Sequence, residues 1–154
     1  MDDAELLQQF QYVTLPFDLW THRAHVKIAY LHLQKYPFDE ALARICDGIK
    51  RYNAANSVPE SVTSGYNQTT TVAFLHLIAA VMRAYEHTHP VRNADEFCDT
   101  HPQLMSKHVL RFFYSPHRRM HPDAKTRFIE PDLAPLPKIV DANPKPEAIG
   151  KDIP

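Results

Sequence analysis

The 154-residue sequence has only three glycines and two cysteines. At the usual frequency of about 7%, a chain of this length would carry about 11 glycines. The shortage argues against glycine-rich phosphate loops, hairpin-rich β architectures and flexible linkers, and it favours helices. Cys46 and Cys98 lie far apart and form no Cys-x-x-Cys pair. Neither a disulfide framework nor a zinc knuckle is therefore indicated.

The sequence also lacks an excess of either charge and a long apolar run. Its 17 basic and 18 acidic residues give a net charge of −1, so the electrostatic footprint of a nucleic-acid or anionic-membrane binder is missing. The longest apolar stretch, residues 72–82, is interrupted by His76 and is much shorter than the roughly 20 residues of a membrane span. The acidic start Met1-Asp2-Asp3 is unlike a secretory signal peptide. We expect a soluble, cytoplasmic protein.

Helical periodicity and capping residues divide the chain into about five helices. Thr21 is a good N-cap, and Asn93 with Glu96 resembles a capping box. The expected helices are a short one near the N-terminus, then residues 22–36, 38–56 and 66–87, and a fifth that begins after Asn93 and breaks near His101-Pro102. The third of these long helices, 66–87, is apolar nearly all round, which is typical of a central helix.

The fold predicted is all-α: a single-domain helical bundle over residues 1–130, with a proline-rich C-terminal extension over 131–154. Proline is incompatible with a helix interior or a central strand. Leu133, Leu136 and Ile139 favour an extended segment that wraps the bundle.

Ten histidines are the compositional feature that points to chemistry, since histidine titrates near neutrality and is the commonest metal ligand. On a helical wheel, His22 lies in the middle of the apolar side of helix 22–36, and His25 lies 60° away. This i, i+3 pair can chelate a metal. Most other histidines, His101 among them, lie near helix ends or prolines and are expected in solvent.

Polar side chains are expected to converge at one end of the bundle. Because consecutive helices are antiparallel, the start of helix 22–36, the end of helix 38–56 and the start of helix 66–87 share that end. The opposite end is expected to be ordinary core. The converging side chains are His22, His25, Asn53, Asn56, Tyr66, Asn67 and Thr70.

Such a group in an apolar bundle, beside a loop over residues 57–65 that can open and close, is typical of a small-molecule site. Desolvation lowers the pKa of histidine and leaves a neutral imidazole as base or ligand. Two helix N-termini would favour negative charge there. Glu130 and Asp132 would add carboxylates if the tail folds back.

The function predicted is a small-molecule enzyme, with His22, His25 and Tyr66 as catalytic residues. Substrate-binding roles are assigned to Asn53, Asn56, Asn67 and Thr70. A divalent metal on His22 and His25 is left open, since two ligands do not close a site and His-x-x-His alone is a weak motif. The alternative is a non-catalytic small-molecule-binding or assembly module in which both histidines are structural. A small-molecule ligand is expected, nucleic acid and membrane are not, and a homodimer is left open.

Several motifs occur together: Trp20-Thr21-His22-x-x-His25, Tyr52-Asn53-Ala54-Ala55-Asn56, Gly65-Tyr66-Asn67-Gln68-Thr69 and Glu130-Pro131-Asp132-Leu133-Ala134-Pro135. In this combination the chain resembles a group of small uncharacterised histidine-containing helical proteins. The resemblance implies a shared fold and site but no reaction. Members tend to have Gly-Tyr-His-Glu-Thr where this chain has Asn67 and Gln68, so a metal site that used that His-Glu pair would be incomplete here.

Overall fold

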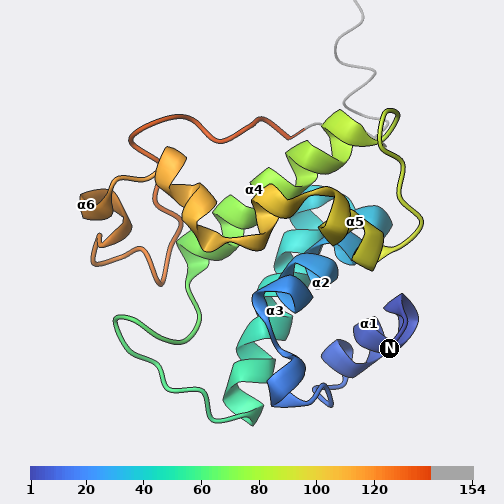
Figure 1. Ribbon diagram of the computed structural model, residues 1–154. Coiled ribbons are helices and arrows are strands. Elements are labelled where there is room, and N and C mark those ends of the chain that lie inside the picture. Colours follow the sequence, from blue (N-terminus) through green and yellow to red (C-terminus); the bar gives the residue numbers. More distant parts are fainter. Residues whose placement is uncertain (140–154) are drawn as a thin grey trace, which may run out of the picture.

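The computed structural model describes residues 1–139, and all regular structure in this range is helical (Figure 1). This confirms the all-α prediction of about five main helices. No helix within 1–139 is long and apolar enough to cross a membrane. The main helices are α1 (Asp3–Gln11), α2 (His22–Lys35), α3 (Phe38–Ala55), α4 (Gln68–Tyr85) and α5 (Ala94–Thr100). The short ones are η1 (Phe17–Leu19), η2 (Pro102–Met105), η3 (Lys107–Phe112) and α6 (Pro116–Arg119).

The helix starts follow from side-chain caps that satisfy the otherwise unpaired first amides. Thr21 Oγ1 accepts from the Ala24 amide at 3.1 Å. Asn67 Oδ1 accepts from the Thr70 amide at 2.9 Å, so α4 begins two residues later than expected. Asn93 caps α5 as predicted.

Helix α2, rather than α4, is the hub of the bundle, because it contacts α1, α3, α4, α5 and η2. The apolar surface of α4 is covered on its other side by the chain that follows α6. Thr69 Oγ1 donates to the Ala124 carbonyl at 2.7 Å and accepts from the Ile129 amide at 3.1 Å. Further along α4, the His76 ring lies 3.3 Å from the Pro137 carbonyl.

The predicted C-terminal wrap exists as far as the described residues reach. Residues 130–139 run along α4 (Figure 1, orange to red), where Leu136 and Ile139 pack partly buried against the core. Leu133 is 58% exposed and is held through its backbone, by a 2.9 Å bond to the Phe113 carbonyl. The rest of the predicted extension, 140–154, lies outside the described residues.

Helix α1 packs through Phe10 against α3 and Trp20. Phe10 is 2% exposed and lies directly over Gly48 of α3, where a Cβ would collide with its ring. Its ring stacks on Trp20 with centroids 5.4 Å apart, and Trp20 in turn packs on Tyr52 of α3 and on His25 of α2. The aromatic stack therefore fixes the first turn of α2 against α3.

The opposite end of the bundle is not the ordinary core expected, since it contains a cavity of about 320 Å³. His101 lines it and is 3% exposed, between Tyr85 and Phe97, so its expected solvation is wrong. After His101 the chain turns inward, as the 1% exposure of Leu104 shows. Other polar groups there pair with each other, as in the 2.8 Å bond from Gln34 to the Tyr30 hydroxyl.

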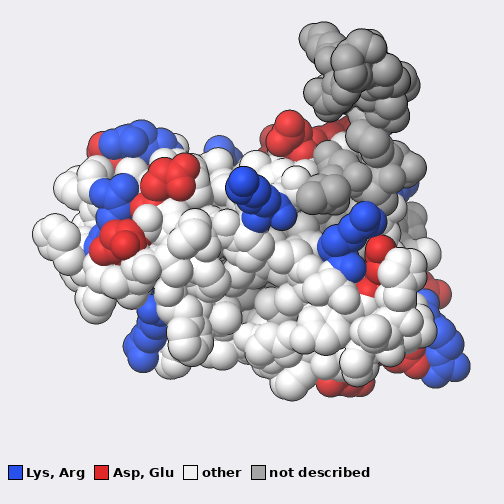
Figure 2. Space-filling model, turned by 90° about the horizontal axis from the view of Figure 1, so that it is seen from above, with Lys and Arg blue, Asp and Glu red and all other residues white. Residues whose placement is uncertain are grey.

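Basic and acidic side chains lie in small groups on the face shown in Figure 2, separated by uncharged surface. Neither sign forms a continuous patch on that face. Several of the ion pairs are local, such as Arg44 with Glu40 and Arg51 with Asp47, each one helical turn apart. Such exposed pairs contribute little to stability.

Candidate functional site

Six of the seven side chains predicted to converge line one cavity of about 140 Å³ where α2 starts and α3 ends. These six are His22, His25, Asn53, Tyr66, Asn67 and Thr70. Asn56 is the exception: it is exposed, and its Nδ2 donates to the Tyr52 carbonyl at 2.9 Å. The antiparallel arrangement of the helices therefore places the end of the bundle correctly, and one amide at the end of α3 does not reach it.

His22 presents one unprotonated ring nitrogen. Its Nε2 lies 2.8 Å from the Leu104 carbonyl, and because a carbonyl oxygen can only accept, Nε2 carries the proton and Nδ1 has the free lone pair. Burial lowers the pKa of His22, partly offset by the bond to Leu104, and the nearby Lys107 lowers it further. The ring edge packs on Phe74, with centroids 5.1 Å apart.

His25 has the opposite tautomer. Its Nδ1 lies 2.7 Å from the Thr21 carbonyl, so Nδ1 donates and Nε2 has the free lone pair. The ring stacks on Trp20, with centroids 3.7 Å apart. Burial lowers the pKa of His25 to about 4, partly offset by the bond to Thr21, and the Lys107 ammonium lowers it further. Both imidazoles are therefore neutral at pH 7.

A backbone carbonyl fixes one N–H of each imidazole and leaves the other nitrogen able to accept a proton or a ligand. The same arrangement orients histidines in acid–base and metal sites, where the hydrogen bond at one ring nitrogen sets the tautomer and leaves the other nitrogen for a proton or a metal. Neither ring bonds to Asn53 or Asn56.

Asn53 is 9% exposed and lines the cavity. Within residues 1–139, no hydrogen bond joins its side-chain amide to another group. The amide is therefore free to form a hydrogen bond with a molecule bound in the cavity. It lies on α3, across the cavity from α4.

The Tyr66 hydroxyl forms a hydrogen bond within the protein. It donates to Gln68 Oε1 at 2.5 Å, and burial together with the neighbouring Cys46 thiol raises its pKa. Lys50 Nζ lies 4.9 Å from the centre of the ring. At neutral pH the phenol therefore stays protonated, and the ring acts as a wall of the cavity.

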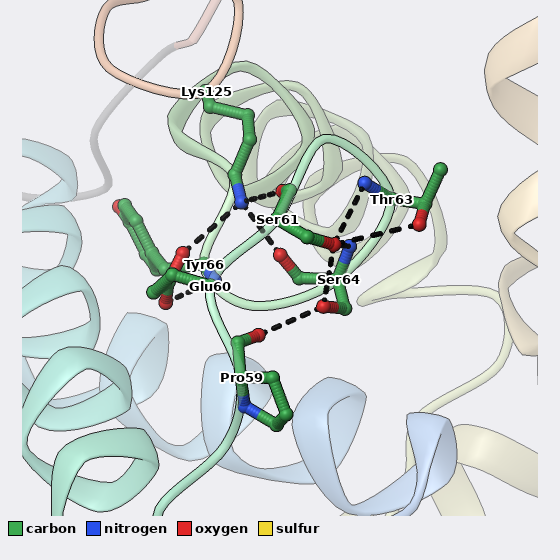
Figure 3. A network of polar contacts seen from close by, with 7 residues as sticks. All are labelled: Pro59, Glu60, Ser61, Thr63, Ser64, Tyr66 and Lys125. Carbon is green, nitrogen blue, oxygen red and sulfur yellow. Dashed lines mark hydrogen bonds and ion pairs between the residues drawn. The ribbon is translucent and has the colours of Figure 1, made fainter.

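The loop over residues 57–65, expected to open and close, is tied down in this structure (Figure 3). Lys125 Nζ reaches Glu60 Oε2 at 3.0 Å, the Ser64 carbonyl at 2.6 Å and the Ser61 carbonyl. Glu60 Oε1 also accepts from the Tyr66 amide at 3.1 Å. Residue 65 has φ +90°, and a Cβ there would collide with the Glu60 carboxylate, so only glycine suits this position.

The carboxylates of the Glu130-Pro131-Asp132 segment are not among the cavity-lining groups. Asp132 accepts from the Ser115 amide at 2.9 Å and from its hydroxyl at 2.6 Å, and these bonds lower the pKa of Asp132. Ser115 in turn caps α6. The segment therefore secures α6 and does not supply the site with carboxylates. No acidic side chain of residues 1–139 lines the cavity.

Lys107, the first residue of η3, is the site residue that the sequence did not indicate. It lines the cavity and lowers the pKa of both His22 and His25. Its position depends on how the chain turns after His101, which no local spacing reveals. The apolar side chains that line the cavity are Val26, Ala29, Ile45, Ile49, Phe74, Leu75 and Ile78.

The donor set does not suit a divalent metal. Among residues 1–139 no three histidine, cysteine or acidic side chains come together as a metal-binding group. The Lys107 ammonium also lines the cavity and repels a cation. Two neutral imidazoles without a third ligand are better suited to proton transfer.

Comparison with models of known protein families, with curated proteins and with solved structures finds no match to this chain.

Proposed function

We propose that the protein is a small-molecule enzyme that uses the His22/His25 pair as general base. The observation that carries the proposal is the pair itself: two neutral imidazoles line one cavity, and each has a ring nitrogen that the fold leaves unbonded. General-base catalysis by a positioned side chain typically accelerates a reaction by 10²–10⁴-fold.

The remaining polar residues bind the substrate or shape the cavity in this proposal. The Asn53 amide and the Thr70 hydroxyl orient the substrate, Asn67 holds the start of α4, and Tyr66 closes one wall. Tyr66 takes no proton at neutral pH, because its pKa is raised and its hydroxyl is bonded to Gln68. The reacting group therefore lies against His22 Nδ1 and His25 Nε2.

Two matched substitutions separate catalysis from structure. The amide nitrogen of glutamine can replace Nε2 of His22, and that of asparagine can replace Nδ1 of His25. His22→Gln and His25→Asn therefore keep the bonds to the Leu104 and Thr21 carbonyls while removing the basic nitrogens.

The test follows the exchange of carbon-bound protons in D₂O by ¹H NMR, with a panel of small carboxylic acids and carbonyl compounds. We expect the wild-type protein to exchange at least one compound, and each variant to lose about 100-fold or more of the rate while it unfolds at nearly the wild-type temperature. Binding without exchange would support the alternative, a non-catalytic binding module. The proposal would also be wrong if both variants retained the wild-type rate.

A further inference from the structure

We infer that the ligand of this cavity is a small amphipathic carboxylate; the inference rests on the proposed function, since it identifies the substrate class of the same site. The lining and the size of the cavity give the first argument. Apolar side chains such as Ile45, Phe74 and Ile78 line it together with the polar groups. A dry cavity of about 150 Å³ holds a benzene molecule, and this one measures about 140 Å³.

Charge gives the second argument. Lys107 is exposed and lines the cavity, and no carboxylate of residues 1–139 forms an ion pair with it. The positive potential that it creates reaches both imidazoles, whose pKa values it lowers. A cation is disfavoured in such a site, and an anion is attracted to it.

The attraction does not come from the N-terminus of α4. The Gln68 and Thr69 amides donate to the Lys125 and Ala124 carbonyls at 3.0 Å each, and the Thr70 amide donates to its cap. These first-turn amides are already satisfied. Lys107 therefore carries the charge argument, rather than the start of α4.

The Asn53 amide gives the third argument, independent of charge. It is nine-tenths buried, lines the cavity and has no partner within the described chain. Its NH₂ group can donate to a carboxylate oxygen of a molecule bound in the cavity.

A carboxylate would also make the proposed chemistry easier. When His22 or His25 takes a proton, an imidazolium forms beside the Lys107 ammonium and the other imidazole. A bound anion offsets this repulsion and raises the pKa of the imidazoles towards neutrality. The same substrate charge therefore supports both binding and base catalysis.

The experiment compares benzoate with benzyl alcohol, a neutral molecule of similar size, by ¹H–¹⁵N NMR titration of the full chain at pH 7. We expect benzoate to bind at least tenfold more tightly, with shifts at cavity residues. Lys107→Gln should remove the preference and leave the affinity for benzyl alcohol within about twofold of wild type. Lys35→Gln, at the far end of α2, is the matched control and should preserve the preference.

The outcomes separate the two proposals. If benzoate binds no more tightly than benzyl alcohol, or if Lys107→Gln keeps the preference, the carboxylate inference is wrong while a small-molecule site remains. Shifts from benzoate confined to residues outside the cavity would also overturn it. If neither compound binds in the cavity, the inference and the small-molecule site both fail. If benzoate binds as expected but no compound undergoes exchange, only the catalytic role fails.

Discussion

Single residues in the segment from Trp20 to His25 each have a separate task. Trp20 stacks on His25, and Thr21 caps α2 with its side chain while its carbonyl holds His25 Nδ1. His22 uses Nε2 to bind the Leu104 carbonyl of η2. The segment from Trp20 to His25 therefore holds two imidazoles in opposite tautomers at the first turn of α2.

The lowered pKa of His25 makes stability depend on pH. The pKa of His25 is lowered from its ordinary value of 6.5 to about 4 in the folded protein, so between these pH values the unfolded chain binds more protons than the folded one. The free energy of unfolding is therefore unaffected by His25 above about pH 6.5 and falls as the pH is lowered to about 4. The loss from this residue is roughly 3 kcal/mol.

Urea denaturation of wild type and of His25→Asn at a series of pH values measures this effect. The free energy of unfolding of the wild type should fall by roughly 3 kcal/mol more than that of the variant between pH 7 and pH 4. Parallel curves for the two proteins would show that His25 is not held neutral by the fold.

The sequence correctly predicted which side chains reach the cavity where the helical face decides this. It failed where the position along the helix, or a segment distant in sequence, decides it. The apolar stripes correctly brought His22 and Asn53 to one cavity. Asn56 shares the stripe of Asn53 but bonds to its own helix end instead. Lys107 was missed because η3 reaches the cavity only through tertiary packing.

Among the elements, α4 shows both the strength and the limit of sequence patterns. Its start was placed within two residues, and its nearly continuous apolar surface correctly indicated burial. The pattern could not identify what covers it. The structure shows the chain after α6 bound to Thr69, a polar residue in the first turn of this helix.

The Thr69 hydroxyl should therefore stabilise the fold strongly. Thr69→Val keeps the shape of the side chain but leaves the Ala124 carbonyl and the Ile129 amide without this partner. We expect a loss of about 1–3 kcal/mol in the free energy of unfolding, measured by urea denaturation.

Thr71→Val is the control for this substitution. Its hydroxyl donates one turn back, to the Asn67 carbonyl at 2.8 Å, and its other polar neighbour is Tyr66, just before the same helix. Because these contacts join no distant segment, the expected loss is below about 1 kcal/mol. Equal losses in the two variants would contradict the view that Thr69 joins α4 to the C-terminal segment.

In the molecule as a whole, both ends of the bundle are hollow, and the proposed chemistry lies at one of them. The larger cavity, near Tyr36 and Tyr85, has both aromatic and aliphatic walls, and several of its polar side chains pair with one another. The smaller one combines two free imidazole nitrogens, an unpaired amide and an unpaired lysine. Composition indicated a helical fold. It was the antiparallel order of the helices, and not composition, that indicated which end of the bundle is polar.

The central claim is that His22 and His25 are neutral at pH 7 with opposite tautomers and one free nitrogen each. Long-range ¹H–¹⁵N spectra of the imidazole rings, recorded from pH 3 to pH 8, test it most directly. The account predicts a protonated Nε2 on His22, a protonated Nδ1 on His25, and no protonation of His25 until the pH approaches about 4. A doubly protonated ring at pH 7, or the reverse tautomers, would contradict it.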